Sequence, residues 1–553
     1  MRVSPRSGRL LLCCGAVAGA LLLGAPAPLA NGGHRNAAPA PLAHDDHRNA
    51  ANFKPCGDAP NVQCAVIRAP LDYDKPLGRK IDLFVARSPA TDRAHRIGVL
   101  FLNFGGPGGS IADFIEAFGA DGFPALNERF DLIGMDPRGV GQSRPSIDCK
   151  ANQETQGIYS EPYQTPFNVD RQALIQKDAR YIARCIALND GILAHVSTAN
   201  VARDMDLVRD ALDERKLNYL GFSYGTFLGA TYASLFPRNY RALVLDGPLD
   251  PDNYVNHPMQ GLREQTAGFE RALGRFFQAC AADQGACLGF GGTDPWDKFD
   301  SLIEQTNATP MPAAGYTPDP RPVTGDDFIA AATVPMYAKQ LWPLLALALS
   351  RAQAGDGSLI RQLTDEFFYS RDPDTGDFSP GNDLYFTIGA SEQRYTRDIG
   401  SYFDAGDDAW GMFDHFYWNT GYVELNYGLY PIHDKDAFYG PFKASNQSPT
   451  PLVVATTYDP ATPYRGALRL VRDLGNARLL TMRGDGHTAY GNGSPNCIDT
   501  AIENYVNTLT LPAQGTSCRQ NIPFAQLQQV QQRALAAPQV RQLLQLHVRP
   551  IVG

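Results

Sequence analysis

The chain has 553 residues, of which 44% are hydrophobic and 19% are charged, a composition typical of a soluble globular protein with a large core. The formal net charge of −9 argues against nucleic acids and anionic membranes as partners. At about 150 residues per domain, the length corresponds to two to four domains or to one large domain that carries an insertion.

The first 30 residues have the order of a secretory signal peptide. Arg2, Arg6 and Arg9 precede an apolar stretch from residue 10 to 25, which small residues and prolines follow. The Pro-, Ala- and polar-rich residues 31–52 favour a disordered linker that contains part of a tandem near-repeat. No later segment offers the roughly 18 uninterrupted apolar residues of a membrane span. We therefore expect an exported protein, periplasmic or extracellular, with no membrane span.

Short apolar runs that end in turn residues recur along the chain, and runs this continuous are typical of parallel strands buried on both faces. They occupy residues 97–104, 130–136, 217–223, 242–247, 451–459 and 477–484. Helical patterns lie between them, for example at 199–214 and at 462–475, where Thr462 is the expected N-cap, Pro463 the first helical residue and Gly475 the stop. The alternation predicts an α/β fold.

Residues 251–445 differ from the rest of the chain. They contain aromatic and polar helical stretches and no comparable apolar strands. A mainly helical insertion between two parts of one sheet would lie over the carboxyl edge of the strands, where ligands bind in such folds. We expect these residues to form a cap, and residues 521–553 to form a Gln-rich helical tail.

The pentapeptide Gly221-Phe222-Ser223-Tyr224-Gly225 follows an apolar run and precedes an Ala- and Gly-rich helical pattern. This is the context of a nucleophile elbow, in which flanking glycines let the chain turn sharply and leave the serine hydroxyl clear of the sheet. Ser223 is therefore the predicted nucleophile.

A serine nucleophile needs a histidine base and an acid that orients it, in the chain order Ser, Asp or Glu, His for this elbow. After Ser223, His487 is the one histidine in a Gly-rich loop that follows an apolar run. Asp459 stands at the end of another such run and is the favoured acid. Asp246 is its main rival, and Asp485 is too close to His487 in sequence to be an obvious orienting group.

The stretch "NFGGPGGS" at 103–110 follows an apolar run and brings the backbone close to a ligand or a reacting atom. A phosphate loop would need a different glycine spacing, and the nucleotide-binding P-loop also needs a lysine. Acyl transfer through a serine requires two N–H donors for the oxyanion, one of them on the residue after the nucleophile. The amides of Gly106 and Tyr224 are the predicted pair.

Eight cysteines follow the signal region, and an even number in an exported chain indicates disulfides. The simplest pairing joins neighbours in sequence: Cys56 with Cys64, Cys149 with Cys185, Cys280 with Cys287, and Cys497 with Cys518. No C-x-x-C or His-flanked pair suggests a metal site, and we predict neither a metal nor a cofactor.

Several motifs in order along the chain resemble the secreted tripeptidyl aminopeptidase branch of the proline iminopeptidase family of α/β-hydrolases. They include "NFGGPGGS", "FDLIGMDPRGVGQSRP", "GFSYGTFLGATYASLFP", "VLDGPLDP", "TTYDPATPYRGA" and "GDGHTAY". The resemblance implies an α/β-hydrolase core at 53–250 and 446–520 with the cap at 251–445. It also implies a serine exopeptidase that releases short peptides, tripeptides above all, or single residues from free N-termini, with Ser223, Asp459 and His487 as the triad.

The stretch "TIGASEQRY" at 387–395 is similar to an I-x-C-x-D/E pattern of relatives, which implies that Glu392 binds the substrate amine. Ala390 occupies the cysteine position, so a disulfide of the relatives is absent from this cap.

Two other functions stay open at this point. A secreted carboxylesterase or lipase would use the same triad, and the need for a free substrate N-terminus separates it from an aminopeptidase. A non-catalytic binding protein on the same fold is the alternative of another class, although such a protein need not keep all three triad residues.

Overall fold

A computed structural model describes residues 51–160, 164–189 and 191–524. The predicted signal peptide, most of the predicted linker and most of the C-terminal tail lie outside these residues. Within the described part of the chain, no helix combines the length and apolar character that a membrane span requires.

One sheet forms the centre of the described structure, with the strand order β1-β2-β3-β5-β4-β6-β7-β8-β9-β10. Neighbouring strands are parallel from β5 through β4, β6, β7, β8 and β9 to β10. The pairs β1–β2, β2–β3 and β3–β5 are antiparallel. The strands are β1 (Lys54–Pro55), β2 (Gln63–Pro70), β3 (Lys80–Ser88), β4 (Gly98–Asn103), β5 (Phe130–Met135), β6 (Leu217–Phe222), β7 (Tyr240–Asp246), β8 (Leu452–Tyr458), β9 (Arg478–Asp485) and β10 (Ser517–Arg519).

The six predicted apolar runs are confirmed as β4 to β9, and β4, β5 and β6 are buried along their whole length. Strands β1, β2, β3 and β10 were not predicted. In β2 and β3, buried residues alternate in part with exposed ones, so these strands lack the continuous apolar run that marks a strand covered on both faces.

Helices cover both faces of the sheet, and the side chains of β4 show how. Val99 and Phe101 point into a core with one helix layer, and Leu100 and Leu102 point into a core with the other. The first layer contains α4 (Thr198–Ala211), α5 (Tyr224–Leu235) and α15 (Tyr464–Leu474), and the second contains α1 (Ala112–Phe118), α2 (Pro124–Asn127) and α16 (Thr500–Thr508).

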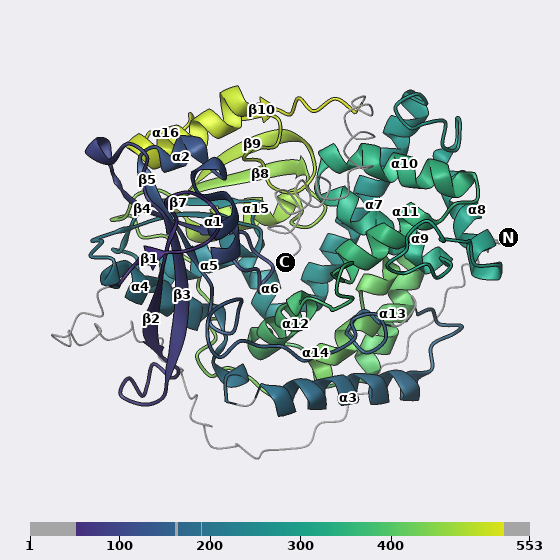
Figure 1. Ribbon diagram of the computed structural model, residues 1–553, viewed down its shortest axis with the longest axis horizontal. Coiled ribbons are helices and arrows are strands. Elements are labelled where there is room, and N and C mark those ends of the chain that lie inside the picture. Colours follow the sequence, from purple (N-terminus) through teal and green to yellow (C-terminus); the bar gives the residue numbers. More distant parts are fainter. Residues whose placement is uncertain (1–50, 161–163, 190, 525–553) are drawn as a thin grey trace, which may run out of the picture. The chain divides into compact units, whose positions relative to one another are not determined.

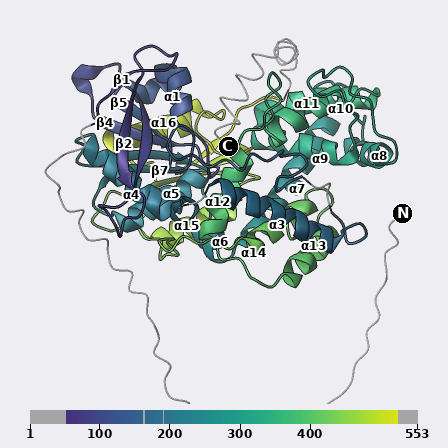
Figure 2. The ribbon, with the colours of Figure 1, turned by 60° about the horizontal axis from the view of Figure 1, so that its bottom comes forward.

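The segment between β7 and β8 is mainly helical, as predicted for the insertion. Its helices are α6 (Pro251–Asn256), α7 (Pro258–Ala282), α8 (Pro295–Ala308), α9 (Gly325–Thr333), α10 (Trp342–Gln353), α11 (Ser358–Leu363), α12 (Gly381–Glu392), α13 (Gly400–Met412) and α14 (Leu425–Leu429). Figures 1 and 2 show α8 to α11 grouped apart from the strands. Leu273, Phe276, Phe299, Leu345 and Ile360 belong to a separate hydrophobic core of this cap.

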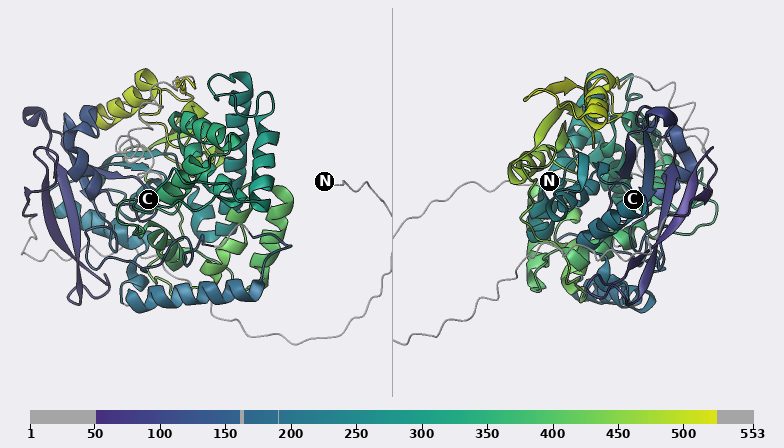
Figure 3. Two further views of the ribbon diagram at one scale, coloured as in Figure 1. Left: turned by 45° about the vertical axis from the view of Figure 1, so that its right-hand side comes forward. Right: turned by 90° about the vertical axis from the view of Figure 1, so that its left-hand side faces the viewer.

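One helix that precedes the nucleophile elbow in sequence also packs on the cap. Helix α3 (Arg171–Leu188) lies beside α14 (Figure 1), and the left view of Figure 3 shows this blue helix below the green helices of the cap. Its Tyr181 and Ile182 share a core with Phe386, Tyr427 and Tyr430 of the insertion. The cap is therefore supported by residues from both sides of the elbow.

Four disulfides join the same cysteine pairs that sequence proximity favoured: Cys56–Cys64, Cys149–Cys185, Cys280–Cys287 and Cys497–Cys518. The Cys149–Cys185 bridge closes the longest loop, with a sequence separation of 36, and it ties α3 to the chain after β5.

Replacing both Cys149 and Cys185 by alanine is expected to lower the free energy of unfolding by about 2–4 kcal/mol, because the bridge restricts the unfolded chain. The Cys56/Cys64 double variant is the matched control and should lose less, since its loop separation is only 8. Calorimetric melting temperatures of the two variants and the parent would test this order. Equal melting temperatures for all three proteins would contradict it.

Candidate active site

Ser223 lies at a sharp turn between β6 and α5. Its backbone angles are φ 54° and ψ −126°, a conformation that a residue with a side chain adopts only where the surrounding structure imposes it. The Ser223 amide donates to the Asp246 carbonyl at 3.0 Å. This strained strand-to-helix turn has the geometry of a nucleophile elbow.

The two flanking glycines are required by close packing. A Cβ atom at Gly221 would lie 2.6 Å from the Gly225 carbonyl oxygen, and one at Gly225 would lie 2.7 Å from the Asn103 carbonyl oxygen. The start of α5 is thus pressed against the end of β4, the neighbouring strand. Larger residues at either position would push the serine out of place.

His487 and Asp459 are in direct contact. The imidazole Nδ1 lies 2.8 Å from Asp459 Oδ2 and 3.0 Å from Oδ1, and both side chains are buried. Asp459 follows the end of β8, and His487 lies just after β9, in the loop opened by Gly486 at φ 91°. The remaining ring nitrogen, Nε2, is buried and makes no hydrogen bond within the described residues. An imidazole held in this way can accept a proton at Nε2.

Thr462 orients Asp459 instead of capping a helix. Helix α15 begins at Tyr464 with Pro463 in the N-cap position, so the predicted N-cap at Thr462 is wrong by one residue. The Thr462 amide donates to Asp459 Oδ1 at 2.8 Å, and its hydroxyl donates to Oδ2 at 2.9 Å. With the Ala461 amide, these donors fix the position of the carboxylate beside His487.

Asp246, the rival acid, supports the histidine loop through the backbone. Its carboxylate accepts from the Ala489 amide at 2.9 Å and from the Tyr490 amide at 2.8 Å. Burial raises the pKa of Asp246 to about 7. The structure thus places Asp459 against the imidazole and Asp246 behind the loop that carries it.

The glycine-rich loop after β4 approaches the elbow. A Cβ atom at Gly105 would lie 2.8 Å from Ser223 Cβ and 3.1 Å from the Tyr224 amide nitrogen. The Gly105 amide donates to Asn103 Oδ1 at 3.0 Å, whereas Gly106 lines the same pocket as Ser223. This arrangement is compatible with the oxyanion role predicted for the amides of Gly106 and Tyr224.

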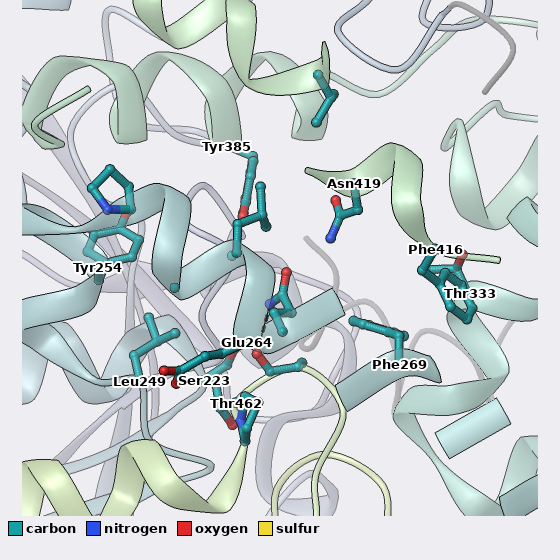
Figure 4. Close-up of a pocket in the computed structure, with 18 of the residues that line it drawn as sticks. Ser223, Leu249, Tyr254, Glu264, Phe269, Thr333, Tyr385, Phe416, Asn419 and Thr462 are labelled. Carbon is teal, nitrogen blue, oxygen red and sulfur yellow. Dashed lines mark hydrogen bonds between the residues drawn. The ribbon is translucent and has the colours of Figure 1, made fainter. Parts of the chain in front are cut away.

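The pocket in front of Ser223 is bounded by the cap and by the loops after β7 and β8. In Figure 4, Ser223, Leu249 and Thr462 lie together, Tyr254 and Tyr385 lie above them, and Phe269 and Phe416 lie on the opposite side. Much of the wall is aromatic, and the amides of Asn382, Gln393 and Asn419 interrupt it. Such a lining suits a ligand that combines apolar side chains with a polar backbone.

Two carboxylates line the pocket, and both are already paired. Asp250 and Glu264 each form an ion pair with Arg469, and Asp250 also caps α6 by accepting from the Asp252 and Asn253 amides. Neither carboxylate is free to hold a substrate cation without losing these partners.

The structure does not place Glu392 in the pocket wall. Its side chain is buried, and its oxygens accept from the Thr198 amide and hydroxyl, both at 2.8 Å, and from the Tyr254 hydroxyl at 3.3 Å. Burial raises the pKa of Glu392 to about 8. Glu392 thus accepts from three donors, one of them the Tyr254 hydroxyl of the pocket wall, and its amine-binding role stays a prediction from the sequence pattern.

Glu424, which carries no distinguishing signal in the sequence, is a buried carboxylate that interacts with the Tyr395 hydroxyl and does not itself line the pocket. Oε2 accepts from the Gly421 amide at 2.8 Å, and Oε1 makes no hydrogen bond of normal geometry in the described part of the chain. Burial raises the pKa of Glu424 to about 7. Burial also raises the pKa of Tyr385 and Tyr395, two pocket residues, and the Glu424 charge adds to the effect.

A cluster of three carboxylates elsewhere could in principle hold a cation. Glu154, Asp319 and Asp365 lie close together. Arginines occupy the space between them, however, because Arg321 pairs with Glu154 and Asp319, and Arg361 pairs with all three. The cluster is an ion-pair network that joins the cap to Glu154 in the segment after β5.

Comparisons with known proteins agree with this geometry. Residues 98–288 match the family model described as alpha/beta hydrolase fold, and residues 437–518 match the one described as TAP-like protein. The chain is similar to Serine protease Hip1 of Mycobacterium tuberculosis, with 32% identity over 82% of this chain and 87% of that protein.

Two further relatives have a similar sequence identity and a similar coverage. Carboxylesterase B of Mycobacterium tuberculosis is 32% identical over 82% of this chain and 86% of its own length. Tripeptidyl aminopeptidase of Streptomyces lividans is 30% identical over 83% of each chain. The chain therefore belongs to the serine hydrolases of the α/β-hydrolase family, in the group that includes Serine protease Hip1 and the tripeptidyl aminopeptidases.

Proposed function

We propose that this serine peptidase is exported and releases short peptides, tripeptides above all, from the free N-termini of its substrates. The observation that carries the proposal is the buried Asp459–His487 pair together with a strained Ser223 that lines a pocket bounded by the cap. The relatives named as a serine protease and a tripeptidyl aminopeptidase support it.

The acylation step uses the three triad residues in order. Ser223 Oγ attacks the scissile carbonyl carbon while His487 Nε2 takes the hydroxyl proton, and Asp459 stabilises the imidazolium that forms. The amides of Gly106 and Tyr224 donate to the oxyanion of the tetrahedral intermediate. Collapse of the intermediate breaks the C–N bond, and His487 returns its proton to the leaving amine.

Deacylation repeats the sequence with water. His487 takes a proton from a water molecule that attacks the acyl-enzyme carbonyl, and the same two amides hold the second oxyanion. The N-terminal fragment leaves as a carboxylic acid, and Ser223 recovers its proton from His487.

The four disulfides support export. Bridges of this kind persist in oxidising compartments and are rare in the cytosol. The secretory pattern of the first 30 residues points to the same conclusion. We therefore propose that the protein acts outside the cytoplasmic membrane, in the periplasm or the medium.

Glu424 is the carboxylate that we assign to the substrate amine. It does not line the pocket itself, but its charge acts on Tyr385 and Tyr395 of the pocket wall, and its Oε1 makes no hydrogen bond of normal geometry in the described chain. Asp250 and Glu264 are paired with Arg469, and Glu392 already accepts three hydrogen bonds. A substrate ammonium that reaches Oε1 would donate to it and would favour the charged form of Glu424.

Replacing Glu424 by glutamine is expected to lower kcat/KM for a free-amine tripeptide amide by about 10- to 100-fold, because a charge-assisted hydrogen bond is lost. The same variant should hydrolyse an N-acetylated ester at the parental rate. Glu392→Gln is the comparison variant, and it should change both substrates by the same factor. A selective loss for free amines in Glu392→Gln, and none in Glu424→Gln, would contradict the assignment.

An esterase is the second candidate, and the similarity to a protein named Carboxylesterase B favours it. Incubation of an unblocked decapeptide and its N-acetylated twin, followed by mass spectrometry, separates the two. The proposal predicts N-terminal fragments of two or three residues from the unblocked peptide and no cleavage of the twin. Survival of both peptides, together with rapid hydrolysis of a butyrate ester, would favour the esterase.

A further inference from the structure

The loop that carries His487 is held from two sides. On the core side, Asp459 contacts the imidazole and Asp246 accepts two amides further along the loop. On the other side lies a short piece of the cap, residues 337–340, between α9 and α10, which we call the bridging segment. The proposed mechanism assigns no role to its contacts.

The first contact is made to the backbone of the histidine itself. The His487 amide donates to the Tyr337 carbonyl at 2.6 Å, and the Tyr337 ring meets the imidazole edge-on, with 5.6 Å between ring centroids. Gly486 makes this approach possible, since a Cβ atom there would lie 2.9 Å from the Tyr337 carbonyl oxygen. The cap therefore touches the histidine through both backbone and ring.

The second contact links Gln340 to the His487 carbonyl through the side chain of Asn492. Gln340 Nε2 donates to Asn492 Oδ1 at 3.0 Å, and Asn492 Nδ2 donates to the His487 carbonyl at 3.1 Å. The bridging segment is thus linked to both backbone groups of His487, to the amide through Tyr337 and to the carbonyl through Gln340 and Asn492. The His487 and Asn492 side chains are buried, so water competes little for these bonds.

The third contact is an ion pair two residues before the histidine. Lys339 Nζ lies 3.4 Å from Asp485 Oδ2, and Arg275 of α7 pairs with Oδ1 of the same carboxylate. Asp485 is buried, and both cations come from the cap. The end of β9, from which the histidine loop departs, is therefore also fixed by the cap.

We propose that the bridging segment, through Tyr337, Lys339 and Gln340, positions His487, so that the cap completes the triad in addition to enclosing the substrate. The inference rests on the proposed role of His487 as base. Its physical basis is the steep dependence of proton transfer on geometry, since a misplacement of about 1 Å can lower a rate by about 100-fold. Lys339 and Gln340, unlike Tyr337, do not line the pocket, and their side chains contact residues of the histidine loop.

Gln340→Met tests the inference, because it keeps the size of the side chain and removes the bond to Asn492. Gln353→Met is the matched control, since Gln353 is a cap glutamine that accepts from the Gly291 amide and does not contact the histidine loop. We expect kcat for a tripeptide amide to fall about tenfold in Gln340→Met with KM within about twofold of the parent. Gln353→Met should match the parent in both constants.

A small fluorophosphonate supplies a readout that does not depend on the peptide pocket. Ser223 Oγ forms a bond to phosphorus, fluoride leaves, and His487 takes the serine proton, so the labelling rate reports on the serine and histidine pair. The rate should fall in Gln340→Met by the same factor as kcat. Equal labelling rates and equal kcat in Gln340→Met and the parent would overturn the inference, as would a change confined to KM.

The test separates the inference from the function on which it rests. If the parent protein is not labelled, the proposed nucleophile fails. If the parent is labelled and Gln340→Met reacts at the same rate, only the bridging role fails. If Gln340→Met does not fold, as judged by its melting temperature, Lys339→Met replaces it in the test. Its kcat for the tripeptide amide and its rate of fluorophosphonate labelling are then compared with those of the parent.

Discussion

Replacement of Ser223 by alanine is expected to lower kcat for a free-amine tripeptide amide by about 10⁴-fold or more, since no other group can form the acyl-enzyme. The fold should survive, because alanine fits wherever serine does and the Ser223 amide still reaches the Asp246 carbonyl. Release of a chromogenic amine measures the first effect, and the melting temperature measures the second.

Ser234→Ala is the matched control for this variant. Ser234 lies on the same helix, α5, and donates to the Ala230 carbonyl within that helix. Its replacement should leave kcat unchanged. Full activity of Ser223→Ala, or an equal loss in both variants, would remove Ser223 from the mechanism.

Asp459→Asn is expected to lower kcat by about 10⁴-fold, because an amide can donate to Nδ1 and so favour the tautomer whose Nε2 carries the proton. That tautomer cannot accept the Ser223 proton. The Thr462 and Ala461 amides would also lose the charge to which they now donate.

Asp246→Asn discriminates between the two acids. Asp246 accepts from backbone amides and does not contact the imidazole, so one amide oxygen can keep part of its role. We expect a far smaller loss of kcat in Asp246→Asn than in Asp459→Asn, with a lower melting temperature, because buried amides lose an acceptor. The reverse order of kcat losses would make Asp246 the orienting acid.

The sequence predicted the central strands and singled out Ser223, Asp459 and His487 because both leave local signals. Strands covered on both faces appear as continuous apolar runs, which β4 to β8 have, whereas β9 is buried only in part. The elbow requires glycine at positions 221 and 225, where contacts with neighbouring backbone leave no space for a side chain. The glycines and the apolar runs can be found from a single sequence, although the backbone that crowds Gly225 belongs to Asn103 of another strand.

The parts that were missed depend on contacts between distant residues. Glu392 matched a local pattern, but its contacts with Thr198, 194 positions earlier, could not be read from that pattern. Glu424 has no distinguishing neighbours in sequence, and it stands out only because folding buries it with one oxygen that makes no hydrogen bond of normal geometry among the described residues. The contact of Tyr337 with His487 joins residues of the insertion and the core. No periodicity or motif encodes such pairings.

The central claim, a serine peptidase that requires a free substrate N-terminus, is tested most directly by hydrolysis of a panel of chromogenic substrates. The panel contains amides of one, two and three residues with free N-termini, their N-acetylated twins, and a butyrate ester. The account predicts hydrolysis of the free-amine amides, fastest for the tripeptide, and little or none of the acetylated twins. Rapid ester hydrolysis without turnover of any amide would contradict it.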